Sequence, residues 1–267
     1  MDDLRKELAP LSDDAWAEIE EEAKRTLVRI LAARKLVDFE GPLGWDVSSV
    51  GIGRNRPLTA PGDGVEAHLR RTQPMLELRV PFELDLLEME CVGRGAKDAE
   101  LQPVKDAARR IAMTEDRAIF HGYADAQIEG ICEAAAADAV SLSTDYLQYP
   151  IAVVTALNTL RNAGVAGPYA IALGPQCYAG LTTTTTAGGY PVLEHVQRLL
   201  DGPIVWAPAV DGAAVLSLRG GDFELTVGQD LSSGYVSHTD TTVRLYLQES
   251  LTFRVLSPEA AVPLVYA

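Results

Sequence analysis

Apolar residues recur at helical spacing near the beginning of the chain and again near its middle. The first stripe follows Ser12, a residue type that favours helix starts, and the second begins with Pro103 at the first position of its helix. The first stripe consists of Trp16, Ile19, Ala23, Leu27, Ile30 and Leu31. These patterns predict one amphipathic helix that ends before Phe39 and a second from Pro103 to Tyr123.

Between these helices the pattern changes to short extended pieces broken by glycine and proline. The segment from Trp45 to Arg79 reads this way and predicts a long two-stranded ribbon. A lone hairpin of this length is marginal in water. We therefore expect it to lie against a neighbouring element or a neighbouring subunit.

The second half of the chain contains both helical and strand-like patterns of apolar residues. A helix is predicted over YPIAVVTALNTLRNAG, a strand over GPYAIALG, and short helices near Pro175 to Leu181 and Val192 to Leu200. The later stretches FELTVGQDL and TTVRLYLQESLTFRVL alternate as strands do. Because helices and strands do not alternate regularly along the chain, the fold class is predicted to be α+β.

Five consecutive threonines stand out in the stretch GLTTTTTAGGYP, from Gly180 to Pro191. β-Branched residues disfavour helix, and Gly188 and Gly189 end any regular element that reaches them. The stretch predicts an exposed, flexible, uncharged loop. A solvated connector is one interpretation of it.

Composition narrows the classes of partner. The chain of 267 residues has 47% hydrophobic residues and a formal charge of −15, so a broad nucleic-acid-binding surface is not expected. Its three cysteines, Cys91, Cys132 and Cys177, lack CxxC spacing, which suits buried residues in a reducing cytoplasm. We find no signal peptide and no apolar run of the roughly 18 residues that span a membrane, so no membrane partner is expected.

No catalytic or metal-binding pattern is apparent. The histidines are His68, His121, His195 and His238, and none belongs to an HExxH motif. Gly51 and Gly53 lack the third glycine of a dinucleotide site, and GxSxG and Walker motifs are absent. The acidic pair Glu115-Asp116 is interpreted as solvent-facing or interfacial. We therefore expect neither catalytic residues, nor a metal, nor a cofactor.

Long blocks of the chain resemble the encapsulins, the shell proteins of bacterial nanocompartments. The likeness is carried by LAPLSDDAWAEIEEEAKRTL, VDFEGPLGW, RVPFELD, PVKDAARRIA, EDRAIFHGY, GPYAIALG, RGGDFELTVGQDLSSGY and VRLYLQESLTF, in that order. The resemblance implies a tailed-phage major capsid fold of the Hong Kong phage type. It places an N-terminal helix and arm at 1–42, an E-loop at 43–80, a peripheral domain with a spine helix at 81–148 and 214–267, and an axial domain at 149–213.

The function implied is that of a non-enzymatic shell. Identical chains, about 60 in the smallest icosahedral class, would enclose a cargo protein that bears a C-terminal targeting peptide, usually a peroxidase or a ferritin-like iron-storage protein. A phage coat protein that packages nucleic acid is the alternative. The acidic composition and the amphipathic N-terminal helix, in place of a basic arm, favour the shell.

Two sites follow from the resemblance. The targeting peptide would lie on Leu27, Ile30, Leu31, Arg34 and Asp38, with Phe253 as a second wall, although these residues could instead only pack the helix onto its own domain. The threonine loop would border a pore at the five-fold axis and select mainly by size. Its residues are Thr182, Thr183, Thr184, Thr185, Thr186, Ala187, Gly188 and Gly189.

Some similar shells hold a flavin against an aromatic residue in the segment that reads FELDLLEMECVGRG here. This chain has Leu86 and Leu87 there, with no tryptophan or tyrosine to stack on the flavin ring. We expect a colourless protein.

Overall fold

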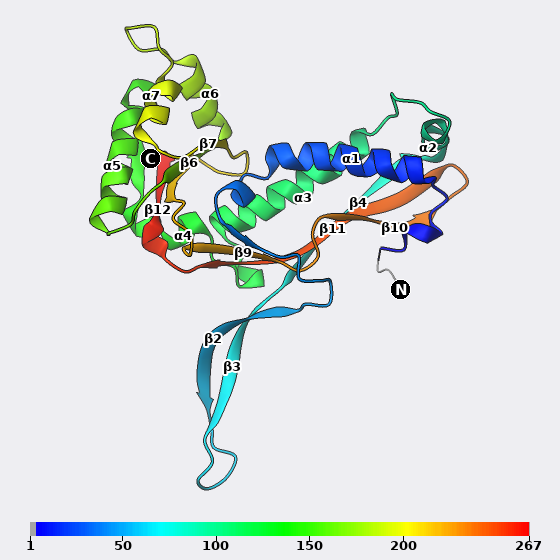
Figure 1. Cartoon of the computed structure of the whole chain (residues 1–267), viewed down its shortest axis with the longest axis horizontal. Coiled ribbons are helices and arrows are strands. Elements are labelled where there is room, and N and C mark those ends of the chain that lie inside the picture. The colour runs from blue at the N-terminus through cyan, green and yellow to red at the C-terminus, as the bar shows by residue number, and fades with distance from the viewer. Residues whose placement is uncertain (1–3, 267) are drawn as a thin grey trace.

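The computed structural model describes residues 4–266, which form two sheets, a set of covering helices and a projecting hairpin (Figure 1). The first sheet is centred on the long strand β11, which pairs with β4 along one edge and with β10 and then β9 along the other. Its strands are β1 (Asp38–Glu40), β4 (Leu76–Asp85), β9 (Phe223–Val227), β10 (Ser232–His238) and β11 (Thr242–Val255).

One face of this sheet is covered by helices. α1 (Asp13–Ile30) and α3 (Gln102–His121) lie across it, with α2 (Leu86–Gly93) at the far end of β4 (Figure 1). Most of their buried apolar residues form one core with Phe82, Leu84 and the first half of β11, whereas Ile119 and Phe120 at the end of α3 belong to a second core. The amphipathic patterns of α1 and α3 therefore face a common sheet. The ends of α3 lie within two residues of the prediction, whereas α1 ends at Ile30, several residues before the predicted end.

The second sheet has the order β5-β12-β8-β6-β7 and its own helices. Its strands are β5 (Val140–Leu142), β6 (Tyr169–Leu173), β7 (Ile204–Trp206), β8 (Ala213–Ser217) and β12 (Ala261–Tyr266). The helices around it are α4 (Ile131–Ala134), α5 (Tyr149–Asn162), α6 (Pro175–Thr183) and α7 (Val192–Leu199). This sheet draws β5, β12 and most of β8 from outside the span 149–213, because the buried strand β8 pairs with both β6 and β12.

A two-stranded hairpin projects from the body (Figure 1). It consists of β2 (Ser49–Leu58) and β3 (Ala67–Pro74), paired antiparallel with an irregularity between Gly51 and Asn55. The predicted ribbon from Trp45 to Arg79 is thus shorter at its C-terminal end. Leu76 already belongs to β4, whose ten residues pair with β11 in the body.

Short 3-10 turns connect these elements: η1 (Lys6–Leu8), η2 (Ala33–Lys35), η3 (Ala124–Ala126), η4 (Ala136–Asp138), η5 (Tyr146–Gln148) and η6 (Pro258–Ala260). Within residues 4–266, every helix is too short or too polar to cross a lipid bilayer.

Candidate functional site

The residues that follow α1 are held in place by the carboxylate of Asp116 in α3. Ser12 caps the start of α1, where its side chain accepts a hydrogen bond from the Ala15 N–H. At the other end, the N–H groups of Ala32 and Ala33 donate to the two carboxylate oxygens of Asp116, at 2.8 and 3.0 Å. Asp116 thereby satisfies two backbone donors at the start of the η2 turn, where N–H groups have no partner within the turn, and the chain turns so that Arg34 points into the interior.

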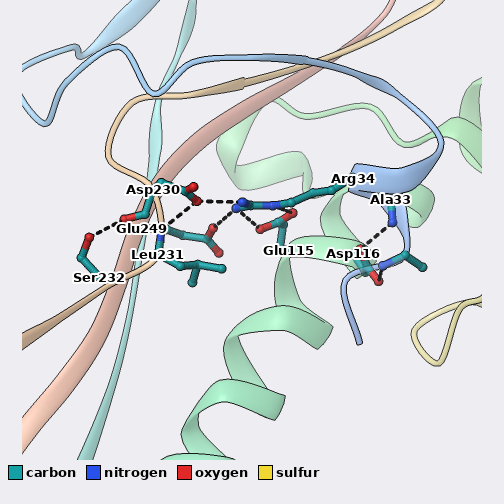
Figure 2. A network of polar contacts seen from close by, with 9 residues as sticks. Ala33, Arg34, Glu115, Asp116, Asp230, Leu231, Ser232 and Glu249 are labelled. Atoms are coloured by element: carbon teal, nitrogen blue, oxygen red, sulfur yellow. Dashed lines mark hydrogen bonds and ion pairs between the residues drawn. The ribbon is translucent and has the colours of Figure 1, made fainter. Parts of the chain in front are cut away.

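Arg34 is the centre of a buried ionic network (Figure 2). Its Nε and Nη2 donate to both oxygens of Glu115, each at 2.8 Å, in a bidentate pair. Nη1 donates to Asp230 at 2.7 Å, and Nη2 also donates to Glu249 at 3.0 Å. One guanidinium therefore joins four separate segments: the residues that follow α1, the helix α3, the β9–β10 connection and the strand β11.

The network contains three carboxylates for one cation. The side chains of Glu115 and Glu249 are fully buried, whereas that of Asp230 is 44% exposed. Burial, and then the charge of Glu115, raise the pKa of Glu249 well above its usual value. Its Oε1 has no hydrogen-bond partner among the described residues. A proton on Glu249 is therefore the arrangement that the site favours.

The acidic pair Glu115-Asp116 was interpreted as solvent-facing or interfacial, and this prediction is wrong. Both residues are 0% exposed. Buried acids need partners, and here these are Arg34 and two backbone N–H groups that lie 80 or more residues away in the sequence. The charge pattern of the helix alone does not reveal such distant partners.

Asp116 predicts a specific pH dependence of stability. Burial raises its pKa from 3.8 to about 7, although the N–H groups of Ala32 and Ala33 oppose the shift. A carboxyl with a higher pKa in the folded state contributes stability at low pH, and this contribution is lost as the pH rises through that folded value. The free energy of unfolding contributed by Asp116 should fall by up to about 4 kcal/mol between about pH 4 and pH 7.

Thermal unfolding of the protein and of Asp116→Asn across this pH range measures the effect. The unfolding temperature of the native protein relative to the variant should decline as the pH rises. Asp125→Asn, at an exposed position, is the matched control. A difference between native protein and Asp116→Asn that is constant with pH contradicts the prediction.

A groove of about 430 Å³ lies between α1 and the start of β10, next to the ionic network. Ala23, Leu27, Val28 and Leu31 line its helical side, with Leu231 and Leu247 opposite. Its charged rim consists of Lys6, Glu20, Lys24, Arg34 and Asp230. An apolar floor with charges of both signs at its rim suits an extended aliphatic peptide with a few polar contacts.

The structure brings only part of the predicted peptide site together. Leu27, Leu31 and Arg34 line the groove, whereas Ile30 lines a different hollow on the other side of α1. Asp38 lies in β1, where its carboxylate accepts from the Gly221 N–H at 2.5 Å. Asp38 lines another hollow, together with Leu36 and Phe223, and not the groove.

The prediction that Phe253 forms a second wall is corrected by its burial. Phe253, in β11, is 1% exposed and packs in the core cluster that extends from β9 and the end of β11 to the second sheet, not with Leu27 and Leu31. In its place, Val28 and Asp230 lie at the groove, and sequence reasoning missed both. Val28 is 59% exposed, and its signal was available because it is an aliphatic residue one position off the buried stripe of α1.

The threonine run is divided between two structures. Thr182 and Thr183 belong to the last turn of α6, and their hydroxyls donate to the backbone oxygens of Tyr178 and Ala179. The expectation of a loop throughout the run is therefore wrong for these two residues. The α6 turn tolerates them because each hydroxyl bonds to the carbonyl four residues before it.

The remaining residues form a narrow hairpin that projects beyond α6 and α7 (Figure 1). The Thr186 N–H donates to the oxygen of Tyr190, and the Gly189 N–H donates to that of Thr186. Gly189 has a φ of 80°, which favours glycine. Ala187 and Gly188 lie exposed at the tip. The loop therefore has a defined shape with small side chains at its end.

Metal binding and flavin binding concern other parts of residues 4–266. No group of three histidine, cysteine or acidic side chains is arranged to hold a metal ion. Leu87, in the segment that was predicted to lack the aromatic residue needed to hold a flavin, is 62% exposed at the start of α2. The expectation of a colourless protein stays a prediction.

Comparisons with known proteins agree over almost the whole chain. Residues 1–252 match the family model described as "encapsulating protein for peroxidase". A type 1 encapsulin shell protein of Rhodospirillum rubrum is 57% identical over 270 residues, covering 99% of this chain and 96% of the relative. A type 1 encapsulin shell protein of Rhodococcus erythropolis is 50% identical, covering 99% of this chain and all of the relative.

Solved structures show the fold. The virus-like particle of Pyrococcus furiosus matches with a TM-score of 0.63 at 18% identity, covering 92% of this chain and 98% of the other. A structure from Mycobacterium phage Bobi matches with a TM-score of 0.59 at 13% identity, covering 89% and 90%. The predicted α+β tailed-phage capsid fold is confirmed. This chain belongs to the family of type 1 encapsulin shell proteins, a structural rather than an enzymatic family.

Proposed function

We propose that this chain assembles with about 60 copies of itself, the smallest icosahedral class, into a closed shell that encloses a cargo protein. The observation that carries the proposal is the β2–β3 hairpin, which extends away from the body (Figure 1). Its exposed aliphatic residues are Leu58, Val65 and Leu69. A hairpin of this kind is marginal alone, and pairing with a neighbouring subunit would bury these side chains and free backbone groups.

Mass photometry of the purified protein, with absorbance at 260 and 280 nm, tests this proposal. We expect particles of shell mass with the absorbance ratio of protein. Leu58→Asp combined with Leu69→Asp should release smaller species, since both side chains would be buried between subunits; Arg54→Lys on the same hairpin is the control. A monomer or dimer of the native chain would defeat the proposal, and nucleic-acid-filled particles would support the phage-coat alternative.

The cargo is proposed to be captured by the groove between α1 and β10. Its apolar floor would receive aliphatic side chains of a C-terminal targeting peptide, while Arg34 and Asp230 would contact polar groups of that peptide. The family description names a peroxidase as what such proteins encapsulate. A peroxidase or a ferritin-like iron-storage protein is accordingly the cargo class that we propose, in the cytoplasm, where the three free cysteines would stay reduced.

The threonine hairpin is proposed to border a pore at the five-fold axis. We assign the helices and strands around the second sheet to an axial domain and the first sheet to a peripheral one. The hairpin projects beyond α6 and α7 of this axial domain, which supports the assignment (Figure 1). Five copies of a tip made of Ala187, Gly188 and Gly189 would give a neutral rim, so passage would depend mainly on size.

Charges placed at this tip should change the entry of small charged molecules. Ala187 is exposed, so Ala187→Lys and Ala187→Asp add a charge without removing a hydrogen bond. Five such charges within a Debye length should shift the entry rates of cationic and anionic probes in opposite directions at low salt, by about tenfold. Stopped-flow measurement of quenching of an encapsulated dye provides the rates, with Ala187→Gln as the control. Equal rates in all three variants would show that the hairpin is not the gate.

A further inference from the structure

A second groove lies on the other side of α1 from the peptide groove. It has a volume of about 510 Å³ and lies between α1 and α3, with Trp206 from the end of β7 also in its wall. Ile30 contributes an apolar surface to it. The volume is within the range of small-molecule sites. We call it the basic groove because of the four cationic side chains that line it: Arg25, Arg29, Lys105 and Arg109.

Only part of this positive charge is neutralised. Glu22 lies 3.5 Å from Arg25 and 3.7 Å from Lys105, so one carboxylate serves two cations. The remaining acid of the groove, Asp106, accepts a hydrogen bond from the side chain of Gln102 at 2.9 Å. Within residues 4–266, Arg29 and Arg109 form no ion pair with an acidic side chain. Two guanidinium groups are thus available in a chain whose formal charge is −15.

An aromatic surface accompanies these cations. Trp206 is 36% exposed and lies in the wall of the groove. A partly exposed indole can stack on a flat ring, while guanidinium groups bind phosphate oxygens in a bidentate manner. The groove thus has three components: a planar apolar face, two guanidinium groups without an acidic partner, and an open volume. Together they match one chemical class of ligand.

We propose that the basic groove binds a nucleoside phosphate. Arg29 and Arg109 hold the phosphate groups, and the base lies on the indole of Trp206. Inorganic phosphate would satisfy the guanidinium groups but not the indole, and an acidic peptide would gain little from a stacking surface. The site is separate from the peptide groove, so it operates whether or not the proposed cargo capture holds.

Isothermal titration calorimetry of the assembled native protein with ADP, at low salt, tests the proposal. We expect one ADP per chain, and weaker binding of inorganic phosphate, of adenosine and of a hexaglutamate peptide. Arg29→Glu combined with Arg109→Glu should weaken ADP binding by at least about tenfold through loss of charge complementarity. Trp206→Leu should weaken ADP binding by about tenfold while leaving the weaker phosphate binding unchanged.

Lys97→Glu together with Arg94→Glu is the matched control, because these exposed cations lie outside the groove and the net charge changes equally. Electron microscopy of each variant establishes that the assembly is intact. ADP binding that is absent, or equal in the groove variants and the control, would overturn the site. Equal affinity for ADP and phosphate, or tighter binding of hexaglutamate, would overturn the assignment of a nucleoside phosphate.

Discussion

Arg34→Met is expected to lower the unfolding temperature by on the order of 10 °C. The change removes the cationic partner of the buried Glu115 carboxylate and a hydrogen-bond donor to the buried Glu249. Breaking a buried ion pair on one side typically costs about 3 to 5 kcal/mol. In a chain of this size each kcal/mol corresponds to about 2 to 4 °C. Because Glu115 is held in a bidentate pair, we expect the free-energy cost to lie in the upper part of the range of about 3 to 5 kcal/mol.

Differential scanning calorimetry of the purified protein measures the effect. Arg94→Met is the matched control, because Arg94 forms an exposed ion pair with Glu90 that should contribute little. Replacing Glu115 and Glu249 with glutamine in the Arg34→Met background should restore part of the loss, since the unpaired acids are then removed. An unfolding temperature for Arg34→Met within the range of Arg94→Met would contradict the central role of the network.

Val28→Asp is expected to abolish capture of the cargo without disturbing the fold. Val28 is 59% exposed in the single chain, so an aspartate there remains hydrated until a peptide covers the groove. Binding would then remove the carboxylate from water and lose an aliphatic contact. We expect the affinity for a targeting peptide to fall by at least about 100-fold, because these two costs together exceed about 3 kcal/mol.

Co-purification of the cargo and titration with its isolated C-terminal peptide measure the loss. Val28→Leu should retain capture, and Ala17→Asp adds the same charge at an exposed position of α1 outside the groove. Ile30→Asp is a poorer test, because Ile30 is 5% exposed and its replacement would disturb the packing of α1. Normal cargo loading of the Val28→Asp protein would contradict the assignment of the groove as the binding site of the targeting peptide.

Much of the fold was accessible from the sequence because it depends on local periodicity. The stripe of α1, the long helix α3 and the alternation of β11 each repeat over enough residues to determine the element type. The hairpin was recognisable from its glycines and prolines, but its end was not. Strand β4 follows without a break in extended conformation, and only its pairing with β11 separates the two.

The site was accessible only in part. The spacing of Leu27 and Leu31 indicated an apolar face, and Arg34 was recognised as a polar neighbour, yet no local pattern distinguishes a residue that lines a groove from one that fills a core. Val28 differs from Leu27 only by about 100° around the helix. This angle leaves Val28 59% exposed beside β10, whereas Leu27 is 7% exposed.

The sequence by itself determined the helices, the main strands and, through its long blocks of resemblance, the family. The tertiary structure decided which distant groups meet. It places Arg34 with Glu115, Asp230 and Glu249, seals Phe253 in a core, and adds β12 to the second sheet. The physical reason is that burial and ionic pairing depend on contacts between residues far apart along the chain, and these contacts leave no periodic signal in the sequence.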